Sequence, residues 1–566
     1  MKKTVSVVIA TCIGIFLCML DTTIMNIALP AIQIGLNVNL SDLSWALNIY
    51  TILFATLTIP LSKLAERVGI NRFYLIGLVT FALGSLVSAF ATNIVLLDVG
   101  RAIQSVGAAT VFPLSMTIGI STVDTSNRPK VIAALGVTQG LAAALGPVIG
   151  GIVTQFLSWR WIFLINIPLM ILVLLLVTFN LSMNQERNAK PIDLQGCILS
   201  MITLFSLTLL LIKGREWGWT SFSVICLVIS FLAGCIAFVF TEHFSKNPMV
   251  PLDLFKSRQF VGASVAIVLS NLFLVGVTVI LPTYFTNIQQ KTELTAALII
   301  TPITVMIFIF STVAALIIDK VGARIVVLLG FVLMAVGYAM FFTVNLYNSL
   351  EVFVACTILG TGYGIIAGPI TVLAAADFTG EKLNSSQSVA GVLRQVGVVL
   401  AVAIFVTNLY AGLASAKVSS VQFASGRIQR LTIPQKQKSM MLKTTKDAIS
   451  TGKTHQRFPV DHFSKIERRA MIHTNYVAAV SRIISPSNSE KVQIMRQVKK
   501  KVDLVLIKQN HNINAAIGDI QTKSESYFTN AFKLLYRNTL PFLFFAILAS
   551  FIFPAFKREK VRNVRH

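Results

Sequence analysis

The chain has 566 residues, of which 55% are hydrophobic and 13% are charged, and its formal net charge is +25. Soluble domains carry about 25% charged residues, so this composition excludes a soluble enzyme. It also excludes an intrinsically disordered chain, which would be poor in apolar residues. All six cysteines lie in apolar segments without the spacing of a zinc site or a disulfide framework, so we interpret them as small hydrophobic residues.

Apolar segments of about 20 residues, the length that crosses a bilayer as a helix, recur along the chain. Fourteen such spans are predicted, at residues 5–28, 44–62, 73–91, 94–118, 131–155, 161–181, 194–213, 221–241, 260–283, 295–318, 325–346, 350–374, 388–411 and 535–556. The predicted fold class is therefore an all-α integral membrane protein with 14 transmembrane helices.

Lys and Arg gather in every second loop between these spans. The richest of these loops lie near residues 63–72, 128–130, 246–258 and 320–324, whereas the alternate loops are nearly bare. Short positive loops stay in the cytoplasm. We therefore expect a multi-pass protein of the cell (plasma) membrane, surrounded by lipid, with both termini cytoplasmic.

Residues 412–534 form a long polar segment that this topology places outside the cytoplasm. It holds 21 Lys and Arg against 7 Asp and Glu, so it carries +14 of the net charge. One interpretation is a solvated surface excursion, and the other is a contact with anionic lipid headgroups or an anionic envelope polymer. Nucleic acid is not predicted as a partner, because a loop outside the cell is poorly placed to meet it.

The sequence repeats itself at an offset of eight spans. The turn ERVGINR at 66–72 follows the second span, and the similar turn DKVGAR at 319–324 follows the tenth. This repetition predicts two six-helix bundles with two extra helices between them, which is the architecture of secondary transporters. A charge network that breaks when the bundles tilt would act as a cytoplasmic latch. The candidate latch residues are Glu66, Arg67, Gly69, Arg72, Asp319, Lys320 and Arg324.

The repeat also divides the chain into five expected regions. Residues 1–181 form an N-terminal six-helix bundle, and 182–258 hold the two inserted helices with their flanking loops. Residues 259–411 supply the first five helices of the C-terminal bundle, 412–534 form the basic loop, and 535–566 hold the last helix and a basic cytoplasmic tail.

A carboxylate stands at membrane depth in the first span, within the sequence LDTTIMNIALP at 20–30. An isolated charge there is costly, so Asp21 must be protonated, paired or in contact with water. Burial disfavours the charged form of a carboxyl group, which would let Asp21 take up and release a proton during transport. The alternative is a helix-end Asp that only hydrogen-bonds its neighbours. Asn26, on the same segment, is a candidate substrate contact.

The fourth span contains both an acid and a base. Asp98 and Arg101 are three residues apart and so share one helical face. Arg cannot plausibly lose its proton, so Arg101 is expected to bias a nearby carboxylate rather than to carry protons. Together with Asp21, these two residues are the candidates for proton coupling. The alternative is a structural ion pair near the outer surface.

Two further membrane segments carry candidate functional residues. The fifth span contains GLAAALGPVIGG at 140–151, whose small residues let helices approach closely and whose proline promotes a kink. The motif residues singled out are Gly140, Gly146, Pro147, Gly150 and Gly151. In the thirteenth span, Arg394 lies deeper than snorkelling requires and is a candidate partner for a carboxylate or an anionic substrate group.

With these residues assembled, the chain resembles the major facilitator superfamily, and more narrowly its fourteen-span drug:proton antiporters. The resemblance rests on the motifs at 20–30 and 140–151, on RAIQ at 101–104 and on WRWIF at 159–163, and it covers about 1–410 and 535–556. It implies multidrug efflux, the export of small amphipathic compounds in exchange for protons by alternating access. The C-terminal half shows no acid at clear midplane depth, which favours monocationic or neutral cargo over dications.

No cofactor, metal or ATP site is predicted, so an ion gradient is the expected energy source. GKT at 452–454 superficially resembles a phosphate loop, but the glycine that the motif requires five residues earlier is Asp447. A secondary active transporter is favoured over an enzyme. Two alternatives stay open: an exporter or flippase of an envelope lipid or metabolite, and a non-transporting receptor or scaffold that uses 412–534.

Overall fold

The computed structural model describes residues 2–38, 40–124, 127–182, 193–450, 463–483 and 487–554. Within these ranges the side chains of Asn26, Pro147 and Asp319 are outside the description. The GKT sequence at 452–454 and the basic tail beyond residue 554 are also outside it. All elements in the described ranges are helical, which confirms the predicted all-α class.

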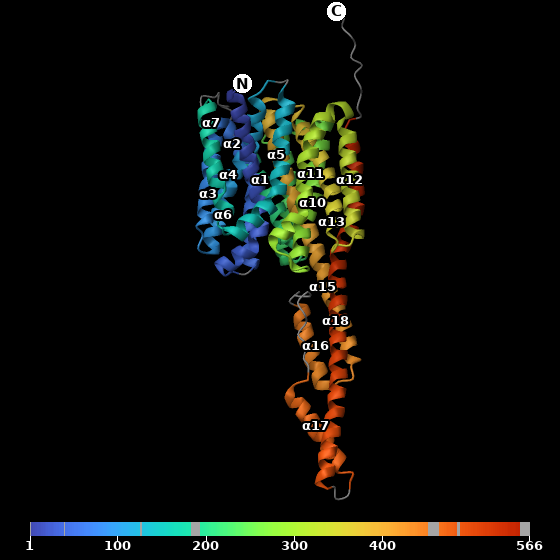
Figure 1. The fold of residues 1–566 in the computed structure, drawn as a ribbon. Coiled ribbons are helices and arrows are strands. Elements are labelled where there is room, and N and C mark those ends of the chain that lie inside the picture. The colour runs from blue at the N-terminus through green and yellow to red at the C-terminus, as the bar shows by residue number, and fades with distance from the viewer. Residues whose placement is uncertain are drawn as a thin grey trace, which may run out of the picture. The chain divides into compact units, whose positions relative to one another are not determined.

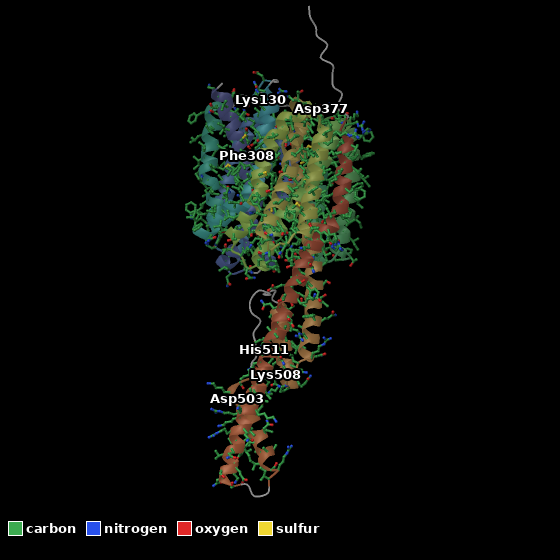
Figure 2. All side chains as sticks on the ribbon, turned by 45° about the vertical axis from the view of Figure 1, so that its right-hand side comes forward. Lys130, Phe308, Asp377, Asp503, Lys508 and His511 are labelled. Carbon is green, nitrogen blue, oxygen red and sulfur yellow. The ribbon has the colours of Figure 1, made fainter. Side chains whose placement is uncertain are left out.

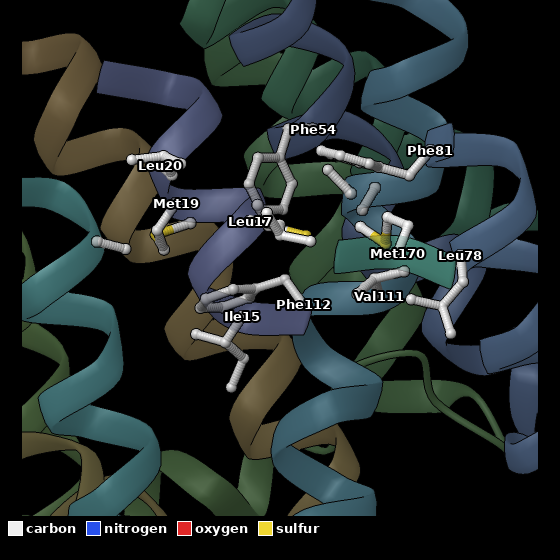
Figure 3. Close-up of a cluster of buried hydrophobic side chains, with 14 of the residues drawn as sticks. Ile15, Leu17, Met19, Leu20, Phe54, Leu78, Phe81, Val111, Phe112 and Met170 are labelled. Atoms are coloured by element: carbon white, nitrogen blue, oxygen red, sulfur yellow. The ribbon is translucent and has the colours of Figure 1, made fainter. Parts of the chain in front are cut away.

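The helices of the first half of the membrane unit lie side by side in a bundle (Figure 1). Its helices are α1 (Lys2–Leu36), α2 (Leu40–Val68), α3 (Ile70–Ala89), α4 (Ile94–Ser121), α5 (Arg128–Phe156), and the pair α6 (Trp161–Leu164) and α7 (Asn166–Asn180). Helix α3 packs on α4, α1 packs on α5, and α2 packs on α4. Figure 3 shows how their apolar side chains meet, with Leu17 of α1, Phe54 of α2, Phe81 of α3, Phe112 of α4 and Met170 of α7 in one buried cluster.

Two helices follow that have no counterpart in the repeat, α8 (Leu194–Trp217) and α9 (Phe222–Phe244). Helix α8 packs against α2 and α9. Large apolar side chains of α9 stay exposed, Phe222 at 83% and Ile236 at 73%. A helix with this much apolar exposure is suited to lipid rather than to water.

The second half of the membrane unit repeats the arrangement of the first. It contains α10 (Arg258–Asn287), α11 (Glu293–Val321), α12 (Ala323–Thr343), α13 (Ser349–Ala375), α14 (Gly380–Ala401) with a π-helical turn (Val402–Val406), and the apolar end of α18 (Asn488–Ala549). A short 3-10 turn (Leu252–Lys256) precedes α10. The halves meet where α11 and α13 pack against α5 and where α14 packs against α2 and α4.

Thirteen helices in the described ranges are long and apolar enough to cross a membrane, and each overlaps a predicted span. The remaining predicted span, the fifth, corresponds to the 29-residue helix α5, several of whose side chains are outside the description. The two repeated turns also share their backbone geometry, because Gly69 has φ +109° and Gly322 has φ +90°. Both values lie where glycine is favoured, so each glycine allows a sharp turn between two spans.

A second compact unit comprises residues 283–291 and 408–534. Its helices are α16 (Gln435–Ser450), α17 (Lys465–Val480), most of α15 (Thr407–Gln429) and the polar part of α18. Asp503, Lys508 and His511 lie along this polar part of α18 (Figure 2). Ile472 of α17 packs with Val502 and Leu506 of α18 in a small apolar cluster, so the unit has an internal core of its own.

Candidate functional site

A buried charged cluster lies between α1 and α4. Arg101 Nη1 forms an ion pair with Asp21 Oδ2, and each side chain is only 1% exposed. Gln104 Nε2 donates to Asp21 Oδ1 at 2.8 Å, and Arg101 Nη1 donates to Gln104 Oε1 at 2.7 Å. Both carboxylate oxygens are therefore occupied, and the charge of Asp21 is matched by a guanidinium that keeps its proton.

Neighbouring groups hold this cluster in one geometry. Arg101 Nε donates to the backbone oxygen of Ala46 at 3.2 Å, and the guanidinium carbon lies 4.2 Å from the centroid of the Tyr50 ring. Ser85 Oγ accepts from Gln104 Nε2 at 2.9 Å. Helices α1, α2, α3 and α4 thus all contribute to the cluster. A change of charge at Asp21 would therefore alter contacts that involve all four helices.

The third candidate for proton coupling, Asp98, is not part of this cluster. Its carboxylate is half-buried, and the buried Oδ1 has no hydrogen-bond partner among the described residues. Arg101 turns to Asp21 instead, and the described residues include no ion pair between Asp98 and Arg101. The structural ion pair considered for the fourth span is therefore absent from this part of the chain.

Sequence reasoning assigned no role to Gln104, Tyr50 or Ser85. The available signal was the RAIQ spacing, which puts Gln104 one turn after Arg101 on the same helical face. Tyr50 and Ser85 come from other helices, and neutral side chains in apolar segments carry no cost that would single them out.

The glycine-rich helix α5 is in close contact with two neighbours. A Cβ atom at Gly146 would lie 1.9 Å from Thr23 Oγ1 of α1, and one at Gly150 would lie 3.0 Å from the Ile24 backbone oxygen. Towards α11, a Cβ at Gly140 would lie 2.7 Å from Ile307 Cγ2, and one at Gly151 would lie 3.4 Å from Leu294 Cα. The motif therefore occupies the junction between the two halves, with α1 on one face and α11 on another.

The first repeated turn contacts the opposite half through hydrogen bonds. Asn384 of α14 donates from Nδ2 to Glu66 Oε1 at 2.6 Å, and Ser62 Oγ donates to Asn384 Oδ1 at 3.1 Å. Ser388 Oγ donates to Ser62 Oγ at 2.7 Å, and Lys63 Nζ pairs with Glu66 Oε2 at 3.1 Å. These contacts hold the α2 end of the first half against the start of α14. Asn384 had carried no signal in the sequence.

The other candidate latch residues are placed differently. Arg67 is exposed and Arg72 is half-buried. In the second turn, Lys320 is exposed, and the guanidinium carbon of Arg324 lies 4.2 Å from the centroid of the Phe551 ring. The two turns thus share a shape, but among the described side chains the contact across the halves involves the first turn.

A small cavity lies between the halves and contains Arg394. It is lined by Phe112, Met116, Gln139, Ile267, Thr371, Gln387, Ala390, Gly391 and Arg394. Both halves contribute, because α4 and α5 provide three of these residues and α10, α13 and α14 provide the rest. No group of three or more His, Cys, Asp or Glu in the described ranges is arranged to hold a metal ion.

The family model of the Major Facilitator Superfamily matches residues 11–402. The chain belongs to this superfamily. This superfamily member is a multi-pass membrane protein whose relatives include drug-resistance transporters. The multidrug resistance protein Stp of Mycobacterium tuberculosis is 28% identical over 72% of this chain and 76% of that protein.

Two further relatives agree with this membership. The multidrug transporter protein MdtP of Bacillus subtilis is 27% identical to this chain, over 68% of this chain and 71% of the length of MdtP. The methylenomycin A resistance protein of Streptomyces coelicolor is 30% identical to this chain, over 69% of this chain and 82% of the length of that protein. The matched family region ends before residues 412–534, so the segment lies outside what the family model describes.

Proposed function

We propose that this superfamily member exports small amphipathic or lipophilic compounds in exchange for protons, by exposing a central cavity alternately to the two sides of the cell membrane. The observation that carries the proposal is the buried Asp21–Arg101–Gln104 cluster, because a carboxylate at membrane depth is the group that a proton-driven cycle needs. The names of the three relatives support drug-like cargo.

The cycle begins with proton uptake at Asp21. Protonation removes the negative charge that faces Arg101 and weakens their Coulomb attraction, which is strong in a water-poor interior. The guanidinium keeps its charge, so it forms hydrogen bonds with other acceptors. This change of partners shifts the four helices that contribute to the cluster. Asp98, whose Oδ1 lacks a hydrogen-bond partner among the described residues, is a second candidate proton carrier on the same helix.

A movement of α1 is passed on to the second half through α5. Thr23 and Ile24 follow Asp21 within one turn of α1 and contact Gly146 and Gly150. The other face of α5 contacts α11. Because these helices pack at the distance of glycine backbones, a shift of α1 displaces α5 and changes the junction between the halves.

Closure at one end of the cavity is assigned to the contacts of Glu66, Ser62 and Asn384. Breaking these hydrogen bonds separates α2 from α14 and opens that end. The positive loops support assigning it to the cytoplasmic side, together with both chain termini. Arg67, Gly69 and Arg72 belong to this turn, and Asp319, Lys320 and Arg324 to its counterpart in the repeat.

The proposal is tested by flux into proteoliposomes under an imposed pH gradient, across a panel of anionic, neutral and cationic fluorescent amphiphiles. Asp21→Asn removes the proton-binding group and is expected to abolish gradient-driven flux while the protein stays in the membrane. Asp253→Asn is the matched control, because Asp253 is an exposed acid outside the spans. Normal gradient-driven flux by Asp21→Asn would remove Asp21 from the coupling role.

A further inference from the structure

The cavity between the halves contains a buried positive charge. Arg394 is 8% exposed, and its Nε has no hydrogen-bond partner among the described residues. Its guanidinium carbon lies 5.8 Å from the centroid of the Phe112 ring, which belongs to the other half of the molecule. An arginine keeps its charge at physiological pH, so the cavity holds a cation.

Other buried cations in the described ranges are compensated by carboxylates. Arg101 pairs with Asp21, and Lys213 pairs with Glu216 at 2.5 Å. Arg394 forms no ion pair with a described residue, and none of the cavity-lining residues is acidic. Burying a charge is costly unless it is paired and hydrogen-bonded, so the missing partner of Arg394 needs an explanation.

Two buried acids of the first half, Asp21 and Glu66, are already occupied. Both carboxylate oxygens of Asp21 accept hydrogen bonds from the α4 cluster. Glu66 bonds Lys63 and Asn384, and Asn384 lies ten residues before Arg394, which is about 15 Å along a helix. Neither carboxylate is therefore available to neutralise Arg394 in this arrangement.

The remaining cavity groups suit an apolar body that carries one polar end. The side chains of Phe112, Met116 and Ile267 provide apolar contact. Gln139 is 2% exposed, and its Oε1 has no partner in the described part of the chain, so its amide can also turn to a ligand. A planar guanidinium matches a carboxylate through two parallel hydrogen bonds.

We propose that Arg394 selects cargo with one anionic group, a carboxylate or a similar oxyanion, attached to an apolar body. This inference rests on the proposed function, because that function makes the bound compound a transported cargo. Binding of the compound at Arg394 can be measured without transport. It differs from the monocationic or neutral cargo expected from the sequence. The sequence also offered Arg394 as a partner for a carboxylate or an anionic substrate group, and the acid-free lining of the cavity favours the anionic substrate group.

The test is equilibrium binding to the purified full-length protein in detergent, with three naphthyl probes of nearly equal size. They are 2-naphthylacetate, its neutral amide, and the cation (2-naphthylmethyl)trimethylammonium. The wild type is expected to bind the acetate at least about tenfold more tightly than the amide, since hydrogen bonds to a charged group are roughly twice as strong as neutral ones. The cation is expected to bind most weakly.

Substitutions at Arg394 are expected to change the binding affinity of the acetate and of no other probe. Arg394→Gln should lower acetate affinity by about tenfold or more and leave amide affinity within about twofold, and Arg394→Lys should keep part of the preference because it retains the charge. Lys130→Gln is the control: it removes an exposed positive charge of the same unit (Figure 2) and should change neither affinity.

The inference would be overturned by equal binding of acetate and amide by the wild type, by tightest binding of the cation, or by an unchanged acetate preference in Arg394→Gln. Absence of acetate binding would overturn it as well. The proposed function fails separately, when none of the amphiphiles crosses the membrane under a pH gradient. Binding of the acetate through Arg394 would still stand in that case.

Discussion

Arg101 and Arg394 are both buried, and they differ in whether a carboxylate faces them. Arg101 faces Asp21, whereas Arg394 faces a cavity without an acid among its lining residues. Removing one partner of a buried ion pair typically costs about 3–5 kcal/mol, because the remaining charge is left uncompensated. Removing a buried charge that has no partner relieves a desolvation cost instead.

The two arginines therefore predict opposite effects on stability. Arg101→Gln should lower the midpoint of thermal denaturation of the purified protein in detergent, because it leaves Asp21 unpaired. Arg394→Gln should leave the midpoint unchanged or raise it. Differential scanning fluorimetry of both variants beside the wild type measures this, and equal destabilisation by the two substitutions would contradict the difference in pairing.

At this scale the sequence reveals charged residues much better than neutral ones. Asp21, Arg101 and Arg394 stand out because a charge in an apolar segment has a high cost. Gln104 and Asn384 have no comparable cost, so their roles depend on contacts that only the fold brings about. The sequence could not predict that Arg101 pairs with Asp21 and not with Asp98, because residue spacing along one helix does not show which residues of a neighbouring helix lie opposite.

Among the helices, the contact between α5 and α1 makes a direct prediction. Gly146→Ala should reduce flux at least about tenfold, because the new methyl group would overlap Thr23 and force the helices apart. Thr23→Gly in the same chain should restore part of the flux by removing the atoms that clash. Flux in proteoliposomes is the measurement. Gly426→Ala serves as the control, since a Cβ atom there meets nothing within 4 Å.

A fully active Gly146→Ala variant would show that close packing of α5 on α1 is not needed for cycling. Loss of activity without any rescue by Thr23→Gly would point to a different partner of Gly146. The single substitution is chosen to be as small as possible, so that insertion into the membrane and overall folding are preserved.

The helical hairpin of α17 and α18 is expected to loosen in acid. Arg468 donates to both carboxylate oxygens of Asp503, at 2.7 and 2.8 Å, and this lowers the pKa of Asp503. A carboxyl group whose pKa is lowered by folding stabilises the folded form when it is ionised. That contribution is present above the unfolded pKa of about 3.9 and is lost as the pH falls below it. Hydrogen bonds from Ser464 lower the pKa of Glu467 and act in the same direction.

Hydrogen exchange of the α17 amides, corrected for intrinsic rates, measures this between pH 6 and pH 3. The wild type should lose protection towards pH 3, and Arg468→Gln should lose less of it over the same range, because part of the acid-sensitive contribution is already missing. The effect is small, since both side chains of the pair are at least 40% exposed. An equal acid-induced loss in both proteins would exclude the Arg468–Asp503 pair as its source.

For the whole molecule, hydrophobic segments and their repetition were enough to predict the all-α class and the spans that the described residues contain. They succeeded because lipid requires about 20 apolar residues per helix and satisfies no free backbone groups. They could not predict that α18 begins at Asn488, far before its apolar end, because a polar helix gives a weak signal. The cavity was equally out of reach, since five separate helices line it.

The segment 412–534 is expected to be accessory to transport. Residues 408–534 form most of a separate compact unit with internal contacts such as the ion pair between Arg427 and Asp519. Replacing 412–534 by a short Gly/Ser linker should therefore leave drug flux within about threefold of the wild type, because a compact unit with its own core can be removed without removing the core of the other unit. Loss of all flux with an intact membrane fold would instead favour the lipid-exporter or receptor alternatives.

The central claim, that Asp21 exchanges protons for cargo, is tested most directly by following protons while cargo drives the cycle. Proteoliposomes are loaded with a transported amphiphile, diluted into cargo-free medium without a pH gradient, and monitored with a pH-sensitive dye. Outward cargo flow should drive protons inward in the wild type and should drive none in Asp21→Asn. Cargo flow without proton movement in the wild type, or proton movement that persists in Asp21→Asn, would contradict the account.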